Sequence, residues 1–482
     1  MWLILATIIV LIISLYWFGT YKYSVIKSFN IPGSTPWPYV GNIPDILKYG
    51  GIKNMLLEYR KRYGNVFHFS IGQSPMVVVA DPELVKLITV KDFDKFRNRH
   101  ISIKLPPPNN SGIGAAVDDQ WKRIRSTLTP TFSASKMKQM VSLIDESCQV
   151  LIGKFREAAD TGRTIKASSC YQQYILEVLL KTAFGMEVDF QNNPNEKIVT
   201  TVRSSFESRQ YLDMFFKSLP FSSLAMKLFS QVLVKKFFSF FNGIAMQIIQ
   251  QRKEKGVDAG RKDLMYLMMN TVDNEGERKL TDDEISAQSV TFLTAGLHTT
   301  STFLSIASYW LAHYPEIQDK LIEEIDAAFA ANPEKPIYDL IHELEYLDCF
   351  FNETLRFSMA AELQISRHCS QTCTINGVHF PRGTVVVLCY FLLHNDPDAW
   401  EEPFKFDPER HRGPVKEKRH PYQFHPFGVG PRSCIGMRLA QLEGKLTLVR
   451  LLREFRFALA PETKHPDGSI PKVVEIRVEN RH

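Results

Sequence analysis

The sequence predicts a mainly α-helical protein with small β-sheet units, preceded by an N-terminal transmembrane helix. Three observations predict this class. Residues 1–21 carry no charge and are mostly apolar. Long amphipathic stretches with the helical period follow, whereas strand-like patterns are confined to two short patches. Strands and helices do not alternate, so the pattern does not indicate a parallel sheet.

The composition excludes several classes of protein. The 482 residues are 44% hydrophobic and 23% charged, which is typical of a globular chain with a large core. A net charge of +6 is too small for a nucleic-acid binder. It fits an acidic protein partner or an anionic membrane surface, and a solvated basic face is the alternative. The seven scattered cysteines predict no disulfide framework and a reducing compartment.

The apolar start of the chain is expected to be a membrane anchor. A helix of 21 residues at about 1.5 Å per residue spans a hydrocarbon core of about 30 Å. Tyr16 and Trp17 lie where an aromatic belt is expected, and Lys22 and Lys27 should stay cytoplasmic. A cleaved signal peptide is the alternative, but the basic start and the small-residue cleavage site are missing. We therefore expect a single-pass anchor at 1–21.

The anchor is followed by a linker at 22–41 and a soluble body at 42–482. The linker contains the segment Pro32–Pro38, whose dense prolines favour an extended, semi-rigid strap. In the body, residues 67–80 are predicted as two strands around a turn at 72–75. The predicted amphipathic helices are 137–158, 171–183, 234–255 and 282–313. A second strand-rich patch covers 373–389, and a last helix runs from about Met437 to Glu454.

Phenylalanine is frequent between residues 203 and 241. The residues include Phe215, Phe216, Phe221, Phe229, Phe237 and Phe241. Core packing is one interpretation of this stretch. The other is a lip that dips into the membrane and admits apolar substrates.

A loop around Cys434 is the strongest chemical signal. Phe427–Gly436 contains three glycines and a proline; two of the glycines and the proline precede Cys434 and exclude regular structure there, and a helix follows the loop. A thiolate in this position is stabilised by the helix dipole and by backbone N–H groups. A phosphate-binding loop is the alternative, but no Lys-Ser or Lys-Thr pair follows.

This loop resembles the haem-binding signature of the cytochromes P450. The fixed positions of that signature are matched by Phe427, Gly430, Arg432, Cys434 and Gly436. The resemblance implies the cytochrome P450 fold, with haem b as cofactor and the Cys434 thiolate as the axial ligand of its iron. A thiolate pushes electron density through the iron and favours cleavage of bound dioxygen.

The resemblance also assigns roles to residues far from the loop. It implies that Arg432 contacts a haem propionate, and that Trp121 and Arg125, which share a helix face, contact the propionates as well. Arg367 is a further propionate candidate by its position.

A second group of charged residues is expected to be structural. Glu353 and Arg356 are three residues apart on a predicted helix and can pair. Phe406–Arg410 resembles the meander element of the family. Its Arg410 would complete a buried triad with Glu353 and Arg356, which would stabilise the core beside the haem.

The helix predicted at 282–313 is expected to carry the oxygen chemistry. It begins with a capping box at Thr281–Glu284, and Gly296 in its middle permits local loosening. Thr299 can donate a hydrogen bond to iron-bound oxygen and relay protons. The family has an acidic residue where this chain has His298. This imidazole either relays protons itself or points away from the haem and only packs.

Two further departures concern the substrate pocket. Residues Phe357–Glu362 lack the proline that usually lines the pocket in the family. His411 replaces a usual aromatic residue. The shape of the pocket therefore does not follow from the resemblance, and neither do the substrate and the regioselectivity.

The resemblance extends from the anchor to Arg456. Asp81–Lys86 and Cys434–Arg438 are most similar to the animal clan that contains the family three drug-metabolising enzymes and thromboxane synthase. The implied function is an NADPH-dependent monooxygenase that inserts one oxygen atom of O2 into a hydrophobic substrate. Its catalytic domain, 42–482, would face the cytosol on the endoplasmic reticulum membrane.

The implied partners are NADPH–cytochrome P450 reductase and, as a second electron donor, cytochrome b5. A basic face would receive the acidic reductase, although surface solubility explains the same charges. The candidates are Lys122, Arg123, Lys416, Lys418, Arg419 and Arg438. Two other functions remain open. One is a haem-thiolate isomerase or dehydratase that acts on a peroxide without a reductase, and the other is a non-catalytic haem or lipid carrier.

Overall fold

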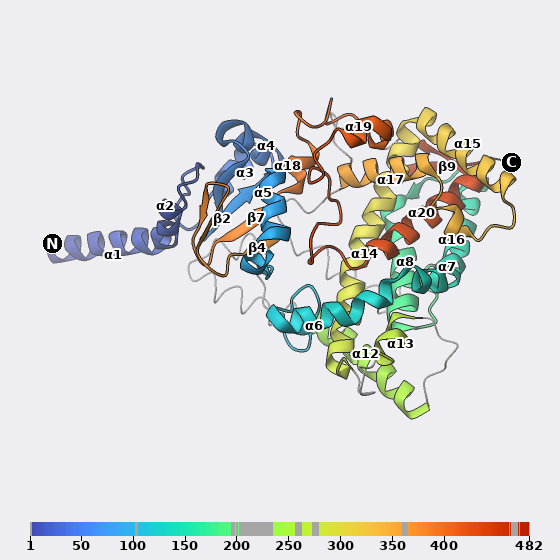
Figure 1. Cartoon of the computed structure of the whole chain (residues 1–482), viewed down its shortest axis with the longest axis horizontal. Coiled ribbons are helices and arrows are strands. Elements are labelled where there is room, and N and C mark those ends of the chain that lie inside the picture. Colours follow the sequence, from blue (N-terminus) through green and yellow to red (C-terminus); the bar gives the residue numbers. More distant parts are fainter. Residues whose placement is uncertain are drawn as a thin grey trace.

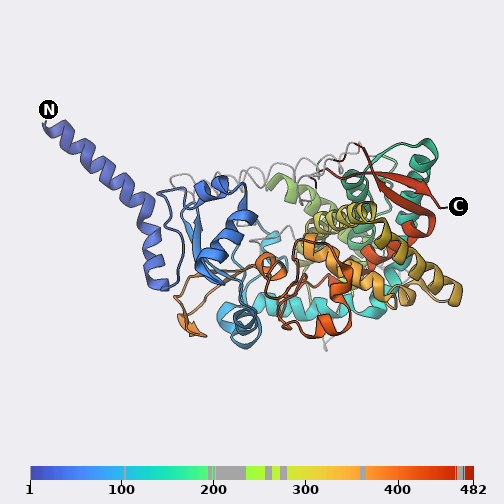
Figure 2. The same ribbon diagram turned by 90° about the horizontal axis from the view of Figure 1, so that it is seen from above.

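The computed structural model describes residues 2–101, 105–193, 198, 201, 235–255, 263–271, 279–358, 365–461, 463, 471 and 473–481. It confirms the predicted class, because helices dominate and the sheets are small (Figure 1). The first helix, α1 (Trp2–Thr20), projects from the body, as Figure 2 shows. Together with the following turns up to Phe29, it is long and apolar enough to cross a membrane.

The end of α1 is fixed to the body rather than hinged freely. Gly19 packs against the ring of Tyr39, which a Cβ atom on Gly19 would approach to 2.7 Å. The hydroxyl of Tyr39 donates to Leu15 O at 2.6 Å, and its backbone N–H donates to Gly19 O at 3.1 Å. Gln73 Nε2 donates to Phe18 O at 3.0 Å. The predicted linker is partly helical, because turns at 21–25 and α2 (Ile26–Phe29) continue the chain.

The largest sheet lies next to the anchor and has the strand order β1-β2-β7-β4. Its strands are β1 (Val66–Ile71), β2 (Ser74–Val79), β7 (Val385–Leu388) and β4 (Ser366–His368). β1 and β2 form the predicted hairpin. β2 and β7 are parallel, which the sequence pattern did not indicate because most of the helices lie between them. β4 pairs antiparallel with β7.

The proline strap runs beside this sheet. The N–H of His68 donates to Pro32 O at 2.9 Å, and Gly33 forms a parallel bridge with His68. A Cβ atom on Gly33 would lie 2.3 Å from His68 O, so only glycine permits this approach. Short helices accompany the sheet: α3 (Ile43–Lys48), α4 (Ile52–Tyr63), α5 (Pro82–Lys86) and α18 (Tyr390–His394).

The helical part contains most of the hydrophobic core. Its long helices are α6 (Asp118–Leu128), α7 (Ala134–Thr161), α8 (Ala167–Leu179), α12 (Lys235–Lys255), α14 (Asp282–His313), α15 (Pro315–Ala331), α17 (Glu345–Ser358) and α20 (Met437–Glu454). Short helices are α13 (Leu264–Met269), α16 (Ile337–Leu340) and α19 (Gly413–Glu417). The predicted bounds of α14 and α20 are confirmed. α8 starts one turn earlier than predicted.

Two smaller sheets complete the fold. One has the order β3-β9-β8, with β3 (Ile165–Lys166), β9 (Glu475–Asn480) and β8 (Phe455–Leu459). The other pairs β5 (Cys373–Ile375) with β6 (Val378–Phe380). The strand-rich patch predicted at 373–389 is therefore confirmed as β5, β6 and β7. The strands β3, β8 and β9 were not predicted.

The phenylalanine-rich stretch is only partly described. Phe237 and Phe241 lie in α12 and are buried in the core, so core packing holds for these two. Phe215, Phe216, Phe221 and Phe229 lie outside the described residues, as do residues 359–362 of the departing pocket segment.

Candidate functional site

The loop before α20 has the sharp geometry that its glycines allow. Gly430 has a φ of 76°, and a Cβ atom on it would lie 2.2 Å from Thr89 O. Both facts require glycine at this position. The N–H of Cys434 donates to Phe427 O at 2.8 Å, and the N–H of Ser433 donates to Gly430 O at 3.0 Å. The loop is thereby closed on itself, and it presents Cys434 three residues before the helix begins.

We infer that the Cys434 side chain faces an internal space. The residue is exposed, yet burial is the main factor that raises the pKa of its thiol. Both statements hold for a side chain that is surrounded by protein but opens onto a cavity. The backbone N–H of Gly436 and the charges of Arg99 and Arg125 lower the same pKa. These groups would stabilise a negatively charged sulfur.

A narrow stripe of residues on α14 is also exposed, although most of the helix around it is buried. Thr281 and Glu284 form the predicted capping box at the start of this helix. From Glu284 to Ala312, only Ala295, His298 and Thr299 are exposed. Their spacing of three and four residues puts them on one face. Because the flanking turns are buried, we infer that this stripe lines an internal space as well.

Two connections hold α14 beside the cysteine loop. Arg432 Nη1 donates to Ile113 O at 3.2 Å, and the N–H of Ile113 donates to Gln288 Oε1 at 2.7 Å. One residue beyond the exposed stripe, Thr300 Oγ1 donates to Glu443 Oε2 of α20 at 3.3 Å. The stripe lies between these two connections along α14, so the stripe and the cysteine loop border the same interior region.

Arg432 is held mainly by backbone carbonyls. It donates to Arg97 O at 3.0 Å, to Ile113 O at 3.2 Å and to Ala116 O at 2.9 Å. Its guanidinium carbon lies 4.1 Å from the ring centroid of Trp121, a cation–π contact. Trp121 is therefore placed to support Arg432. Most of the donors of Arg432 are already used.

Four arginines surround the cysteine loop. Arg99 Nη2 donates to Arg432 O at 3.0 Å, and Arg125 Nη1 donates to Ser433 O at 2.9 Å. Arg367 is buried, and its Nε has no hydrogen-bond partner among the described residues. Burial, followed by the charges of neighbouring arginines, lowers the pKa of Arg367 to about 10 and that of Arg432 to about 9.

These positive charges are poorly compensated. Among the residues that the structure describes, Asp118 is the one carboxylate that shifts the pKa of any of the four arginines, and it acts on Arg432. Such a cluster fits the anionic carboxylates of a bound prosthetic group. Arg99 was not predicted from the sequence, because the basic stretch around it matches no motif. The accessible Cys434 sulfur and the arginine cluster together fit a haem with its thiolate ligand.

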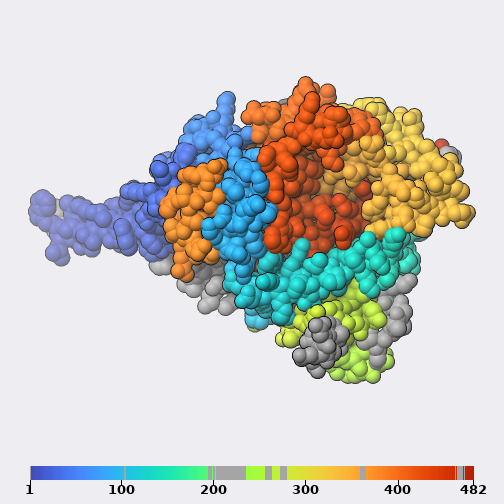
Figure 3. Space-filling model, viewed as in Figure 1, coloured from blue at the N-terminus to red at the C-terminus, as the bar shows by residue number. Residues whose placement is uncertain are grey.

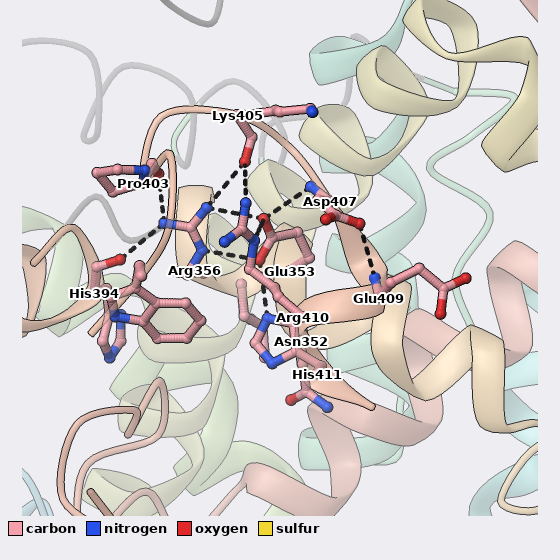
Figure 4. Close-up of polar contacts among 12 residues, drawn as sticks. Asn352, Glu353, Arg356, His394, Pro403, Lys405, Asp407, Glu409, Arg410 and His411 are labelled. Atoms are coloured by element: carbon pink, nitrogen blue, oxygen red, sulfur yellow. Dashed lines mark hydrogen bonds and ion pairs between the residues drawn. The ribbon is translucent and has the colours of Figure 1, made fainter. Parts of the chain in front are cut away.

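The predicted structural triad is brought together in the interior (Figure 4). Arg356 donates from Nε and Nη2 to the two oxygens of Glu353, both at 2.8 Å, and both side chains are fully buried. Arg410 Nε lies 3.1 Å from Glu353 Oε1, at an angle that is poor for a hydrogen bond. Its terminal nitrogens donate to Glu401 O at 2.8 Å and to Lys405 O at 3.1 Å.

A fourth residue, His411, belongs to this group. His411 Nε2 lies 2.9 Å from Glu353 Oε2, and the N–H of Asp407 donates to Glu353 Oε1 at 3.0 Å. Burial raises the pKa of Glu353, but hydrogen bonds from Arg356 and His411 outweigh it and hold the pKa at about 2. The sequence singled out His411 only as a departure from the family. It gave no sign of this contact.

Some of the basic residues that we predicted to bind the reductase already interact with other residues of the protein. Arg123 pairs with Glu284, Arg438 donates to Phe132 O at 3.2 Å, and Arg419 stacks on Trp400. Lys122, Lys416 and Lys418 are exposed, and their side chains make no ion pair or hydrogen bond with the residues that the structure describes. Figure 3 shows the orange-red C-terminal segment on one face of the molecule, above the cyan helices α6 and α7.

Comparisons with known proteins show the family of the chain. The protein-family model described as cytochrome P450 matches residues 31–479. The chain is 37% identical over 473 residues to cytochrome P450 3A29 from Sus scrofa, which covers 96% of this chain and 92% of the relative. Cytochrome P450 3A7 from Homo sapiens gives the same identity, length and coverage. Cytochrome P450 3A28 from Bos taurus is 36% identical over 473 residues, covering 96% and 91%.

Proposed function

The chain belongs to the cytochrome P450 family and is a haem-thiolate monooxygenase of this family; from this premise we propose that the Cys434 sulfur would hold the iron of haem b and that electrons come from NADPH through a reductase. The substrate is a hydrophobic organic molecule that receives one atom of O2. The observation that carries this proposal is the accessible sulfur of Cys434 within a cluster of four arginines.

The protein holds the cofactor through its own charges. Arg99, Arg125 and Arg367 would bind the propionates, and Arg432, which is held by three carbonyls, would add a fixed positive charge. The N–H of Gly436 and the charges of Arg99 and Arg125 lower the pKa of the Cys434 thiol against the larger effect of burial, and they would stabilise the sulfur as a thiolate when it holds the iron. When bound, the haem supplies the iron at which dioxygen is activated.

The exposed stripe of α14 supplies protons. The hydroxyl of Thr299 donates to Ala295 O at 2.7 Å, which fixes its oxygen at the edge of the internal space. Burial lowers the pKa of His298, so its imidazole is neutral near pH 7 and can both accept and donate a proton. We assign His298 as the group that recharges Thr299, in the place where the family has an acid.

Exposed lysines and the N-terminal helix support our proposals for electron delivery and for membrane attachment. The exposed Lys122 of α6 and Lys416 and Lys418 at α19 are our candidates for docking an acidic reductase, and cytochrome b5 is a second candidate partner. Residues 1–21 anchor the chain in the endoplasmic reticulum membrane, and 42–482 form the cytosolic catalytic domain. The rigid contact of Gly19 with Tyr39 supports a fixed orientation of this domain.

The ligand assignment is tested by spectroscopy of the full chain. The carbon monoxide difference spectrum of the dithionite-reduced protein should have its Soret band at the position of thiolate-ligated haem. Cys434→Ser should abolish this band. Cys170→Ser, at a half-buried cysteine in α8, is the matched control and should leave it unchanged. A thiolate-type band that survives in Cys434→Ser would overturn the assignment.

The reaction type is tested by the source of electrons. Turnover of apolar substrates by the holoenzyme should require NADPH, the reductase and O2 together. Rapid rearrangement of an organic peroxide without NADPH and reductase, combined with no reductase-supported oxygenation, would favour the isomerase instead.

A further inference from the structure

Two cysteines outside the candidate site have their sulfur atoms side by side. Cys369 directly follows β4, and Cys373 opens β5. Their sulfurs are 4.0 Å apart. Cys369 is buried, whereas Cys373 is partly exposed. The thiol of Cys369 also donates to Gln371 O at 3.0 Å, within the short loop that separates the two residues.

The backbone around the pair is firmly held. The N–H of Cys369 donates to Thr384 O at 2.9 Å, and Cys369 O accepts from the N–H of Gly383 at 2.8 Å. Cys373 pairs with Phe380 in the β5–β6 ladder. A disulfide needs a sulfur–sulfur distance of about 2.05 Å. The backbone at Cys369 and Cys373 is held in place, and the two sulfurs are 4.0 Å apart. We therefore expect rotation of the two side chains, with a small shift of the loop between them, to close this gap.

The two thiols are not equivalent. Burial raises the pKa of both, and for Cys369 the neighbouring Cys373 raises it further, to about 12. For Cys373, the hydrogen bond from Cys369 and the charge of Lys95 act in the opposite direction, while Asp92 opposes them. Cys373 is thus the accessible sulfur that ionises first, and Cys369 is the sulfur beside it.

We propose that Cys369 and Cys373 form a peroxide-sensitive thiol pair that closes to a reversible intramolecular disulfide. The Cys373 thiolate attacks hydrogen peroxide, the O–O bond breaks, and the leaving hydroxide takes up a proton as water. Cys369 then attacks the Cys373 sulfenic acid, and a second water leaves as the S–S bond forms. Two thiols and one peroxide give one disulfide and two waters, so the sulfurs lose the two electrons that the peroxide gains. A cellular dithiol reverses the reaction.

The position of the pair connects it to the arginine cluster. β4, which ends beside Cys369, carries Arg367. The N–H of His368 donates to Asn98 O at 2.8 Å, and Ser370 donates to Lys95 O from both its N–H and its hydroxyl. Formation of the disulfide would therefore pull on the two backbone segments that carry Arg367 and Arg99.

The test uses the full-length holoenzyme and added hydrogen peroxide, so it does not depend on the proposed oxygenation. After brief exposure, free thiols are alkylated and the protein is digested with trypsin. Cleavage at Arg367 and Arg382 puts both cysteines in one peptide. We expect this peptide to escape alkylation, to lose two hydrogens in mass and to regain both thiols with dithiothreitol. The peptide with Cys434 is measured in the same digest.

Two variants separate the steps. Cys369→Ser should leave a Cys373 sulfenic acid that a dimedone probe traps, whereas Cys373→Ser should leave Cys369 as an unreacted thiol. The buried Cys148 of the same sample is the internal control and should stay reduced. Alkylation of both cysteines after peroxide, separate oxidation of each to a sulfinic acid, or a disulfide formed only between two molecules would each overturn the proposal.

Discussion

His411 Nε2 lies 2.9 Å from Glu353 Oε2 in the interior, where the family pattern has an aromatic residue in place of the histidine. Burial lowers the pKa of His411 more than Glu353 raises it. The imidazole is therefore neutral near pH 7, and its N–H donates to the carboxylate. Glu353 thus has a neutral hydrogen-bond donor in addition to its arginines.

Replacing His411 by Phe should change both the stability and its pH dependence. At pH 7.5 the variant should lose about 1.5–3 kcal/mol, the usual contribution of a hydrogen bond to a charged group. Because the folded pKa of His411 lies below its unfolded value of about 6.5, the wild type loses stability as pH falls through that region. The difference between the two proteins in urea denaturation should therefore shrink towards pH 5.5.

His379→Phe is the control for this change. His379 lies in the β6 strand and is only half-buried, so its replacement should cost little at either pH. A stability difference for His411→Phe that stays constant from pH 7.5 to 5.5 would contradict the neutral assignment.

Glu353→Gln should be the most destabilising change in the buried charge group. It leaves Arg356, which is fully buried, without its bidentate counter-charge. Removing one partner of such a pair costs about 3–5 kcal/mol. We expect low haem incorporation and an early denaturation midpoint. Glu345→Gln removes the exposed partner of Arg412 and should cost less than about 1 kcal/mol. Equal effects of the two variants would refute the structural role of Glu353.

The sequence predicted those features that depend on local pattern. The bounds of α14 follow from the capping box at Thr281 and the proline after Tyr314. The hairpin β1–β2 follows from two apolar-rich runs on either side of the turn that begins at Gly72. The cysteine loop was found because several fixed residues occur within ten positions.

Contacts between distant segments could not be predicted in this way. β7 pairs with β2 across most of the chain, and no local pattern specifies that register. Arg99 reaches the cysteine loop through a bond to Arg432 O, but arginine is common on surfaces and the stretch around it has no motif. His411 meets Glu353 only because the chain between them folds back around α17.

Glu443→Gln should stabilise the protein at alkaline pH. Glu443 is fully buried, its nearest hydrogen-bonding group is Thr300, and burial raises its pKa to about 8. Because the unfolded value is about 4.3, the folded state loses stability as pH rises from about 4.3 through 8. The amide of Gln keeps the contact with Thr300 without a charge. The variant should exceed the wild type by a few kcal/mol at pH 8.5 (about 1.4 kcal/mol per pKa unit) and match it below about pH 4.

The control for this change lies on the same helix. Glu454 pairs with Arg156 at the surface at 2.5 Å, so Glu454→Gln should alter stability by less than about 1 kcal/mol at all pH values. Thermal denaturation across the pH range distinguishes the two variants. A Glu443→Gln protein that is less stable than the wild type at pH 8.5 would show that the carboxylate has a favourable partner.

His298→Ala should lower coupled turnover, because it removes the imidazole that we assign to recharging Thr299. General acid–base groups contribute about 10²–10⁴-fold in rate, and water can replace part of that. We therefore expect a loss of about tenfold in product per NADPH, measured with purified reductase. His298→Asp restores the acid of the family and should keep most of the coupling. Full coupling in His298→Ala would assign the histidine to packing alone.

Thr299→Ala should release peroxide in place of product. Thr299 carries the hydroxyl group of the exposed stripe, and its hydrogen bond to Ala295 O holds this hydroxyl in position. Its removal should leave NADPH consumption largely intact while hydrogen peroxide rises and product falls, which is measured as peroxide formed per NADPH. Ser305→Ala is the matched control, because its hydroxyl makes the same type of bond, to Ser301 O at 2.8 Å, but is buried in the core. If both variants release the same amount of peroxide, the loss of a helix-bonded hydroxyl explains the effect, and Thr299 has no special role in proton delivery.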